Sequence, residues 1–263
     1  MGLLAYGYGR LRQLNDINIV PAQGWRVVCF AVGWTVLTIA IVSPLCRMAA
    51  TLTSAHMVQH AILVAVAPPL LILGGAGSTM IMALPSRLRR GRLMQNGTRP
   101  IRTWKGSLAI GGLYGVTIWL WHVPAFYQSA LLNPAIHLLM YGTLLIASLL
   151  FWGDILGPAQ RERAAAASLL LVATLMHTSL LGALLTFSSA PWYSVLADRS
   201  GVWDVTPLED QQLAGLIMWV PMGAIYLVSA LGQLAAWLRL GEDSQPDFQV
   251  KVARASSSQR QPT

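Results

Sequence analysis

Two histidines one helical turn apart form the local pattern in this 263-residue chain that most favours chemistry. His56 and His60 are separated by four positions, so a helix would carry both imidazoles on one face. Two imidazoles arranged in this way can bind the same metal ion. Met57 adds a thioether beside them, although its position directs it partly away from that face. The pair predicts a metal site, and hydrogen bonding to neighbouring helices is the alternative use of both rings.

Other potential ligands follow later in the chain, and they are histidines and methionines rather than carboxylates. Met218 and Met222 are again four positions apart and flank Pro221. Thioethers with imidazoles suit copper(I), because soft ligands select that ion, although methionine also fills ordinary apolar cores. The candidate metal ligands are therefore His56, His60, His122, His137, Met218 and Met222.

The elements that must position these residues are apolar segments long enough to cross a bilayer. Of all residues 55% are apolar and only 11% are charged, where a soluble domain carries about a quarter charged residues. A transmembrane helix needs roughly 20 apolar residues. Six segments approach that length, which predicts an all-α polytopic transmembrane helical bundle: 25–43, 54–75, 107–122, 135–153, 166–188 and 213–238. Residues 1–24 and 241–263 are expected to be a cytoplasmic N-terminal segment and a disordered cytoplasmic tail around this domain of residues 25–240.

The distribution of basic residues predicts the orientation in the membrane. With the N-terminus in the cytoplasm, all but two of the 18 Lys and Arg residues fall on the cytoplasmic side, the exceptions being Arg47 and Arg199. This is the bias expected of a plasma-membrane protein with both termini inside. The net charge of +8 is therefore a topology signal, and it does not indicate nucleic-acid binding.

This orientation places four of the five histidines near the outer ends of three helices. His56 and His60 open the second helix from the outside, His122 ends the third, and His137 begins the fourth. His177 lies alone in the middle of the fifth. Ionisable groups at membrane depth are costly and usually face the bundle interior with a function. We therefore expect His56, His60 and at least one of His122 and His137 to share one outer site, above a helix kink at Pro68-Pro69.

Four blocks of the sequence resemble the CtaG-like family of cytochrome c oxidase assembly factors. The matching blocks are HMVQHAILVAVAPPLLILG at 56–74, WHVPAFY at 121–127, the helix of His177 with PWY at 191–193, and QQLAGLIMWVPMG at 211–223. The resemblance implies a non-enzymatic protein of the bacterial plasma membrane that helps to assemble a haem-copper oxidase, with the oxidase subunits as partners, by binding or delivering copper at the outer face. The resemblance implies a role in binding this copper for His56, His60, His122, Met218 and Met222.

Two points lie beyond that resemblance. His137 is outside the matching blocks, so its place in the site depends on its depth alone. Family members typically have a further helix before the first one found here, and the opening residues MGLLAYGYGRLRQLN resemble only the end of such a helix.

Two other classes of protein remain as alternatives. A haem-binding electron-transfer protein needs two histidines on facing helices, which His56 or His60 opposite His122 or His137 can supply. A small transporter is compatible with the kink and with His177, although almost no charged residue lies in the middle of the membrane to form an ion path. A hydrolytic enzyme is the weakest interpretation, because no carboxylate accompanies the histidines within the membrane.

Overall fold

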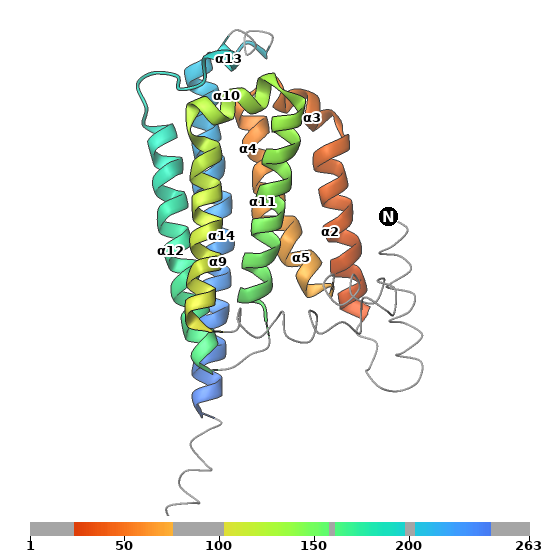
Figure 1. The fold of residues 1–263 in the computed structure, drawn as a ribbon, viewed down its shortest axis with the longest axis vertical. Coiled ribbons are helices and arrows are strands. Elements are labelled where there is room, and N and C mark those ends of the chain that lie inside the picture. The colour runs from red at the N-terminus through yellow and green to blue at the C-terminus, as the bar shows by residue number, and fades with distance from the viewer. Residues whose placement is uncertain (1–23, 76–102, 158–160, 198–202, 243–263) are drawn as a thin grey trace, which may run out of the picture.

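The computed structural model describes residues 24–75, 103–157, 161–197 and 203–242, and within these ranges the chain is helical and contains no strand. Long helices stand side by side, and the short helices α3, α10 and α13 lie across one end, here called the histidine end (Figure 1). This confirms the predicted all-α bundle. The elements are α2 Gly24–Val42, α3 Pro44–Ala49, α4 Thr53–Ala61, the π-helix η1 Ile62–Val66, α5 Ala67–Leu73, α9 Trp104–His122, α10 Pro124–Leu132, α11 Pro134–Ile155, α12 Arg161–Thr186, α13 Ser194–Ala197 and α14 Pro207–Glu242.

The long helices have the length and composition of membrane spans. Five qualify alone, and the count reaches six if α9 and α10, which are bent by 71° relative to each other, form one span. Many of their large apolar side chains point outward, as lipid-facing residues should; Leu138, Leu169 and Val228 are each about 70% exposed. The prediction of about six spans is confirmed.

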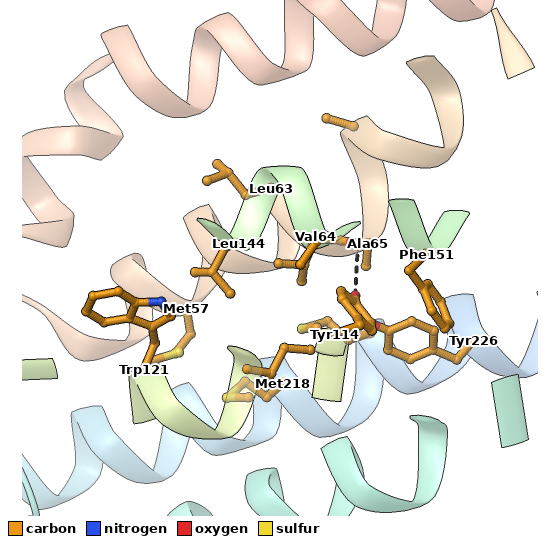
Figure 2. Close-up of a cluster of buried hydrophobic side chains, with 14 of the residues drawn as sticks. Met57, Leu63, Val64, Ala65, Tyr114, Trp121, Leu144, Phe151, Met218 and Tyr226 are labelled. Carbon is orange, nitrogen blue, oxygen red and sulfur yellow. Dashed lines mark hydrogen bonds between the residues drawn. The ribbon is translucent and has the colours of Figure 1, made fainter. Parts of the chain in front are cut away.

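Pro68 and Pro69 interrupt the backbone hydrogen bonding of the span Thr53–Leu73, and the structure shows how the bundle accommodates this interruption. The backbone widens into η1 immediately before the two prolines. Since proline has no N–H, the carbonyl oxygen of Val64 loses the donors that an α-helix or a π-helix would supply. Trp152 Nε1 donates to that oxygen at 2.8 Å. The Tyr114 hydroxyl also donates to it, at 3.2 Å (Figure 2). Side chains from α9 and α11 thus replace the missing backbone donors.

The start of α4, which carries the histidine pair, is held by α14. Leu52 at its N-cap makes no side-chain capping bond. Instead, the buried Asp210 accepts hydrogen bonds from the backbone N–H groups of Thr53 at 2.5 Å and Ser54 at 3.1 Å, and from the Ser54 hydroxyl at 2.5 Å. A side chain 157 positions away therefore satisfies the free donors of this helix end.

Basic residues of the described helices lie mainly at the end opposite the histidines. Arg26, Lys105 and Arg163 are in the first turns of α2, α9 and α12, and Arg239 is in the last turn of α14, while Arg47 is at the histidine end. This distribution agrees with the predicted orientation. Arg10, Arg12, most of the basic loop before Lys105, Arg199 and the tail after Glu242 lie outside the described residues, so the domain division at 24 and 241 remains a prediction.

Candidate functional site

Four imidazoles from three helices lie together at the histidine end. The ring centroids of His56 and His60 on α4 are 4.5 Å apart. His60 is 5.7 Å from His122, the last residue of α9, and His56 is 5.6 Å from His137 in the first turn of α11. We call these four residues the histidine cluster. His56, His60 and His122 are at most 4% exposed, whereas His137 is half-buried.

Buried imidazole nitrogens without a partner distinguish this cluster from ordinary core histidines. Nε2 of His56, Nε2 of His122 and both ring nitrogens of His60 are buried and make no hydrogen bond. The opposite nitrogens of His56 and His122 bond to the carbonyl oxygens of Ala49, at 3.3 Å, and Ile118, at 2.7 Å. These bonds place the proton on Nδ1 and leave a lone pair on Nε2, which is how protein imidazoles are prepared to bind metals.

Two tyrosines form the walls of the cluster. The ring of Tyr127 on α10 lies 5.0 Å from His56, and its buried hydroxyl also lacks a hydrogen-bond partner. The ring of Tyr141 on α11 lies 4.5 Å from His137 and about 6 Å from both His56 and His60. Aromatic rings therefore pack directly against the histidine cluster.

Polar residues outside the histidines fasten the elements around the cluster, and the sequence did not identify them as site residues. The buried Gln59 bonds to α2 and to Tyr141. Tyr193 donates from its hydroxyl to the carbonyl oxygen of His122 at 3.1 Å, and its ring packs 4.2 Å from Tyr127. Gln211 in turn accepts from the backbone N–H of Trp192 at 2.6 Å. The one sequence signal of Gln59, Tyr193 and Gln211 is that they lie within the matching blocks at 56–74, 191–193 and 211–223.

The predicted methionine ligands are buried, but their relation to the cluster is indirect. Met57, Met218 and Met222 are at most 2% exposed and belong to the same buried apolar core, of which Figure 2 shows Met57 and Met218. Met218 follows Asp210 by eight residues, or about 12 Å of helix, and His60 follows Thr53 by seven, or about 10 Å. Because Asp210 bonds to Thr53, this register puts Met218 near the depth of His60.

His177 stands apart from the cluster, as expected. Its Nδ1 accepts a hydrogen bond from Trp119 Nε1 at 3.3 Å. A Cβ added to Gly115 would lie 3.3 Å from its Nε2, so the ring occupies the groove that this glycine leaves on α9. The ring thus has a structural explanation that needs no metal.

Two of the three ring separations, 5.6 and 5.7 Å, agree with shared ligation, whereas the rings of His56 and His60 lie closer, at 4.5 Å. Imidazole nitrogens lie ~2 Å from a metal, so the ring centres of ligands to one ion lie roughly 5–6 Å apart. Among the described residues, no three His, Cys, Asp or Glu side chains are grouped as a ready-made metal site. Binding would therefore require rotation of rings. No hydrogen bond holds the His60 ring, and the rings of His56, His122 and Tyr141 pack around it.

A polytopic helical membrane protein with a buried histidine cluster at one end is the class that this fold and site define. The chain matches the model of the cytochrome c oxidase caa3 assembly factor family (Caa3_CtaG) over residues 2–240. It therefore belongs to this family, and the resemblance found in the sequence is confirmed. Neither a curated protein nor a solved structure is similar enough to the chain to count as a match.

Proposed function

We propose that this protein binds copper(I) at the histidine cluster and delivers it to a caa3-type cytochrome c oxidase during assembly. The observation that carries the proposal is the set of four buried imidazole nitrogens, from His56, His60 and His122, that have no hydrogen-bond partner. Leaving a buried polar atom unpaired costs about 1–3 kcal/mol, so a cluster of such atoms needs a compensating ligand. A metal ion satisfies several of these lone pairs at once.

The donor set favours copper(I) over other metal ions. Neutral imidazoles and nearby buried thioethers are soft to intermediate ligands, whereas Mg²⁺ and Ca²⁺ require oxygen ligands. His56 and His122 present Nε2 from rings held by backbone carbonyl oxygens. No hydrogen bond engages either ring nitrogen of His60, so this residue is suited to take up the ion and release it. The role is binding and transfer rather than catalysis.

The proposal includes an orientation, because the oxidase must receive the metal at the histidine end. We place this end at the outer face of a bacterial plasma membrane and both termini in the cytoplasm. Basic residues support this assignment, since Arg26, Lys105, Arg163 and Arg239 lie at the opposite end of the bundle. Cytoplasmic ends of membrane helices carry such an excess of Lys and Arg.

The test is copper(I) binding by the purified full-length protein. Cuprous ion is titrated in competition with a chromogenic chelator, using wild type, His60→Ala and His177→Ala. We expect wild type to bind, His60→Ala to bind at least about tenfold more weakly, and the matched His177→Ala control to equal wild type. Absence of binding by wild type, or equal affinity of all three proteins, would contradict the proposal.

A further inference from the structure

We propose that Tyr127 is a further metal ligand of the histidine cluster, and that its phenolate oxygen, together with imidazole nitrogens, lets the cluster bind copper(II) as well. This inference rests on the proposed function and deepens it, because it assigns a second oxidation state of the ion to the same site. Tyr127 lies on α10, the short helix across the histidine end, which supplies none of the predicted ligands (Figure 1).

The hydroxyl group of Tyr127 is a buried polar group without a hydrogen-bond partner. The side chain is fully buried, and its ring packs edge to face against His56, with the ring centroids 5.0 Å apart. An unpaired buried oxygen is unfavourable unless a ligand uses it. The hydroxyl groups of Tyr141 and Tyr193 each already donate a hydrogen bond within the protein. Of these three tyrosines, Tyr127 is therefore the one whose oxygen is available.

The surroundings of this hydroxyl group are the residues that enclose the cluster. It interacts electrostatically with the hydroxyl groups of Tyr141 and Tyr193. The ring of Tyr141 lies about 6 Å from those of His56 and His60, and Tyr193 bonds to the carbonyl oxygen of His122. The available oxygen is thus within range of side chains that contact three of the four histidines.

The charge of copper(II) explains why a phenolate suits this site. Neutral imidazoles compensate neither of its two positive charges, and an uncompensated charge in a buried site is costly. Among the described residues, Asp210 is the buried acid at the histidine end, and both of its oxygens already accept hydrogen bonds from the start of α4. Tyr127 can supply a negative oxygen at the cluster itself, and nitrogen ligands combined with oxygen ligands are typical of copper(II).

This ligation requires no oxidant or reductant. Copper(II) replaces the phenol proton of Tyr127: the O–H bond breaks, a Cu–O bond forms, and the proton leaves to water, as protons do when a protein binds a metal. No electron is transferred. A phenolate bound to copper(II) has an intense charge-transfer band in the visible spectrum, whereas a phenol that only packs against the site has none. The ligand therefore has an optical signature.

The test is titration of the purified full-length protein in detergent with copper(II), followed by visible absorption. Tyr127→Phe removes the oxygen and keeps the ring, and Tyr141→Phe does the same at the other tyrosine that faces His56. Tyr226→Phe is the matched control, because this buried tyrosine bonds to Tyr114 outside the cluster. Thermal unfolding of each variant identifies any variant that is not folded. The spectrum of wild type by itself tests for a bound phenolate, so the result does not depend on the folding of Tyr127→Phe.

We expect copper(II) to produce the charge-transfer band in wild type, Tyr141→Phe and Tyr226→Phe. Tyr127→Phe should lack the band and bind copper(II) about tenfold more weakly or worse, since even residues that act on a metal through its ligands have effects of this size.

Three outcomes would overturn the assignment of Tyr127: no band in wild type, a band that persists in Tyr127→Phe, or loss of the band in Tyr141→Phe alone. The proposed function stands after any of these if wild type still binds copper(I) in the chelator competition. If wild type binds neither ion, both proposals fail.

Discussion

Tyr141 donates a hydrogen bond of 2.5 Å to Oε1 of Gln59, and this bond joins two residues 82 positions apart along the chain. The amide nitrogen of Gln59 donates to the carbonyl oxygen of Ala40 at 2.5 Å. One side chain therefore connects α2, α4 and α11 beside His56 and His60. Because Gln59 is fully buried, water cannot reach its amide group, and these two hydrogen bonds satisfy the amide instead.

Replacing Gln59 by Leu should destabilise the bundle. The carbonyl oxygen of the buried Ala40 would lose its partner, and the Tyr141 hydroxyl would lose its acceptor, at a cost of about 1–3 kcal/mol. Thermal unfolding of the purified protein in detergent measures this loss. Gln128→Leu is the matched control, since Gln128 makes its bond with Ser194 at an exposed site. Equal unfolding temperatures for the two variants would contradict the role given to Gln59.

The broken helix beneath the cluster leads to a second stability prediction. Trp152→Phe keeps an aromatic ring but removes the stronger of the two donors to the Val64 carbonyl oxygen, leaving the 3.2 Å bond from Tyr114. We expect a loss of about 1 kcal/mol, the net value of a typical intramolecular hydrogen bond. Trp104→Phe, at a position 65% exposed, should leave the unfolding temperature unchanged. A loss of equal size in both variants would show that ring volume, and not the donated bond, is responsible.

Much of the fold follows from local sequence properties, and the exceptions show what such properties omit. Apolar runs and their flanking prolines predicted the long helices and the interruption at Pro68-Pro69, because both depend on neighbouring residues alone. The predicted apolar segments 107–122 and 135–153 leave the residues between them without a predicted element, whereas the structure has the helix α10 there, at Pro124–Leu132. The nine residues between Pro124 and Pro134 are too few to show the hydrophobic periodicity that would identify a helix lying across the end of a bundle.

The candidate site was predictable in its depth but not in its contacts. Helix ends determined that His56, His60, His122 and His137 lie at one level, and that His177 does not. The roles of Gln59 and Asp210 depend on partners that are distant in the chain, and no local pattern specifies which helices become neighbours. The residues that hold the cluster in place are therefore defined by three-dimensional contacts between helices and not by a local sequence pattern.

The orientation can be checked independently of any metal. A reporter fused after Gly241, at the end of α14, should be active in the cytoplasm, and a reporter inserted at Asp204 should be exported. The reason is the basic residues at the end of the bundle opposite the histidine cluster. Export of the Gly241 fusion would mean that the protein has the opposite orientation, with the histidine cluster on the cytoplasmic side. That orientation would contradict delivery of copper from outside.

The last prediction connects the histidine cluster with oxidase assembly in the host. His60→Ala should lower cytochrome c oxidase activity in membranes more than His177→Ala. His60 has two unpaired ring nitrogens and lies among three other imidazoles, whereas His177 already has Trp119 as a partner. Activity is measured per amount of assembly factor in the membrane, so that a variant that is merely unstable is not counted as defective. Added copper should restore part of the activity of the His60→Ala strain if the missing step is metal delivery. Equal activity of the two variants would mean that His60, like His177, serves packing, and the cluster would then have no part in assembling the oxidase.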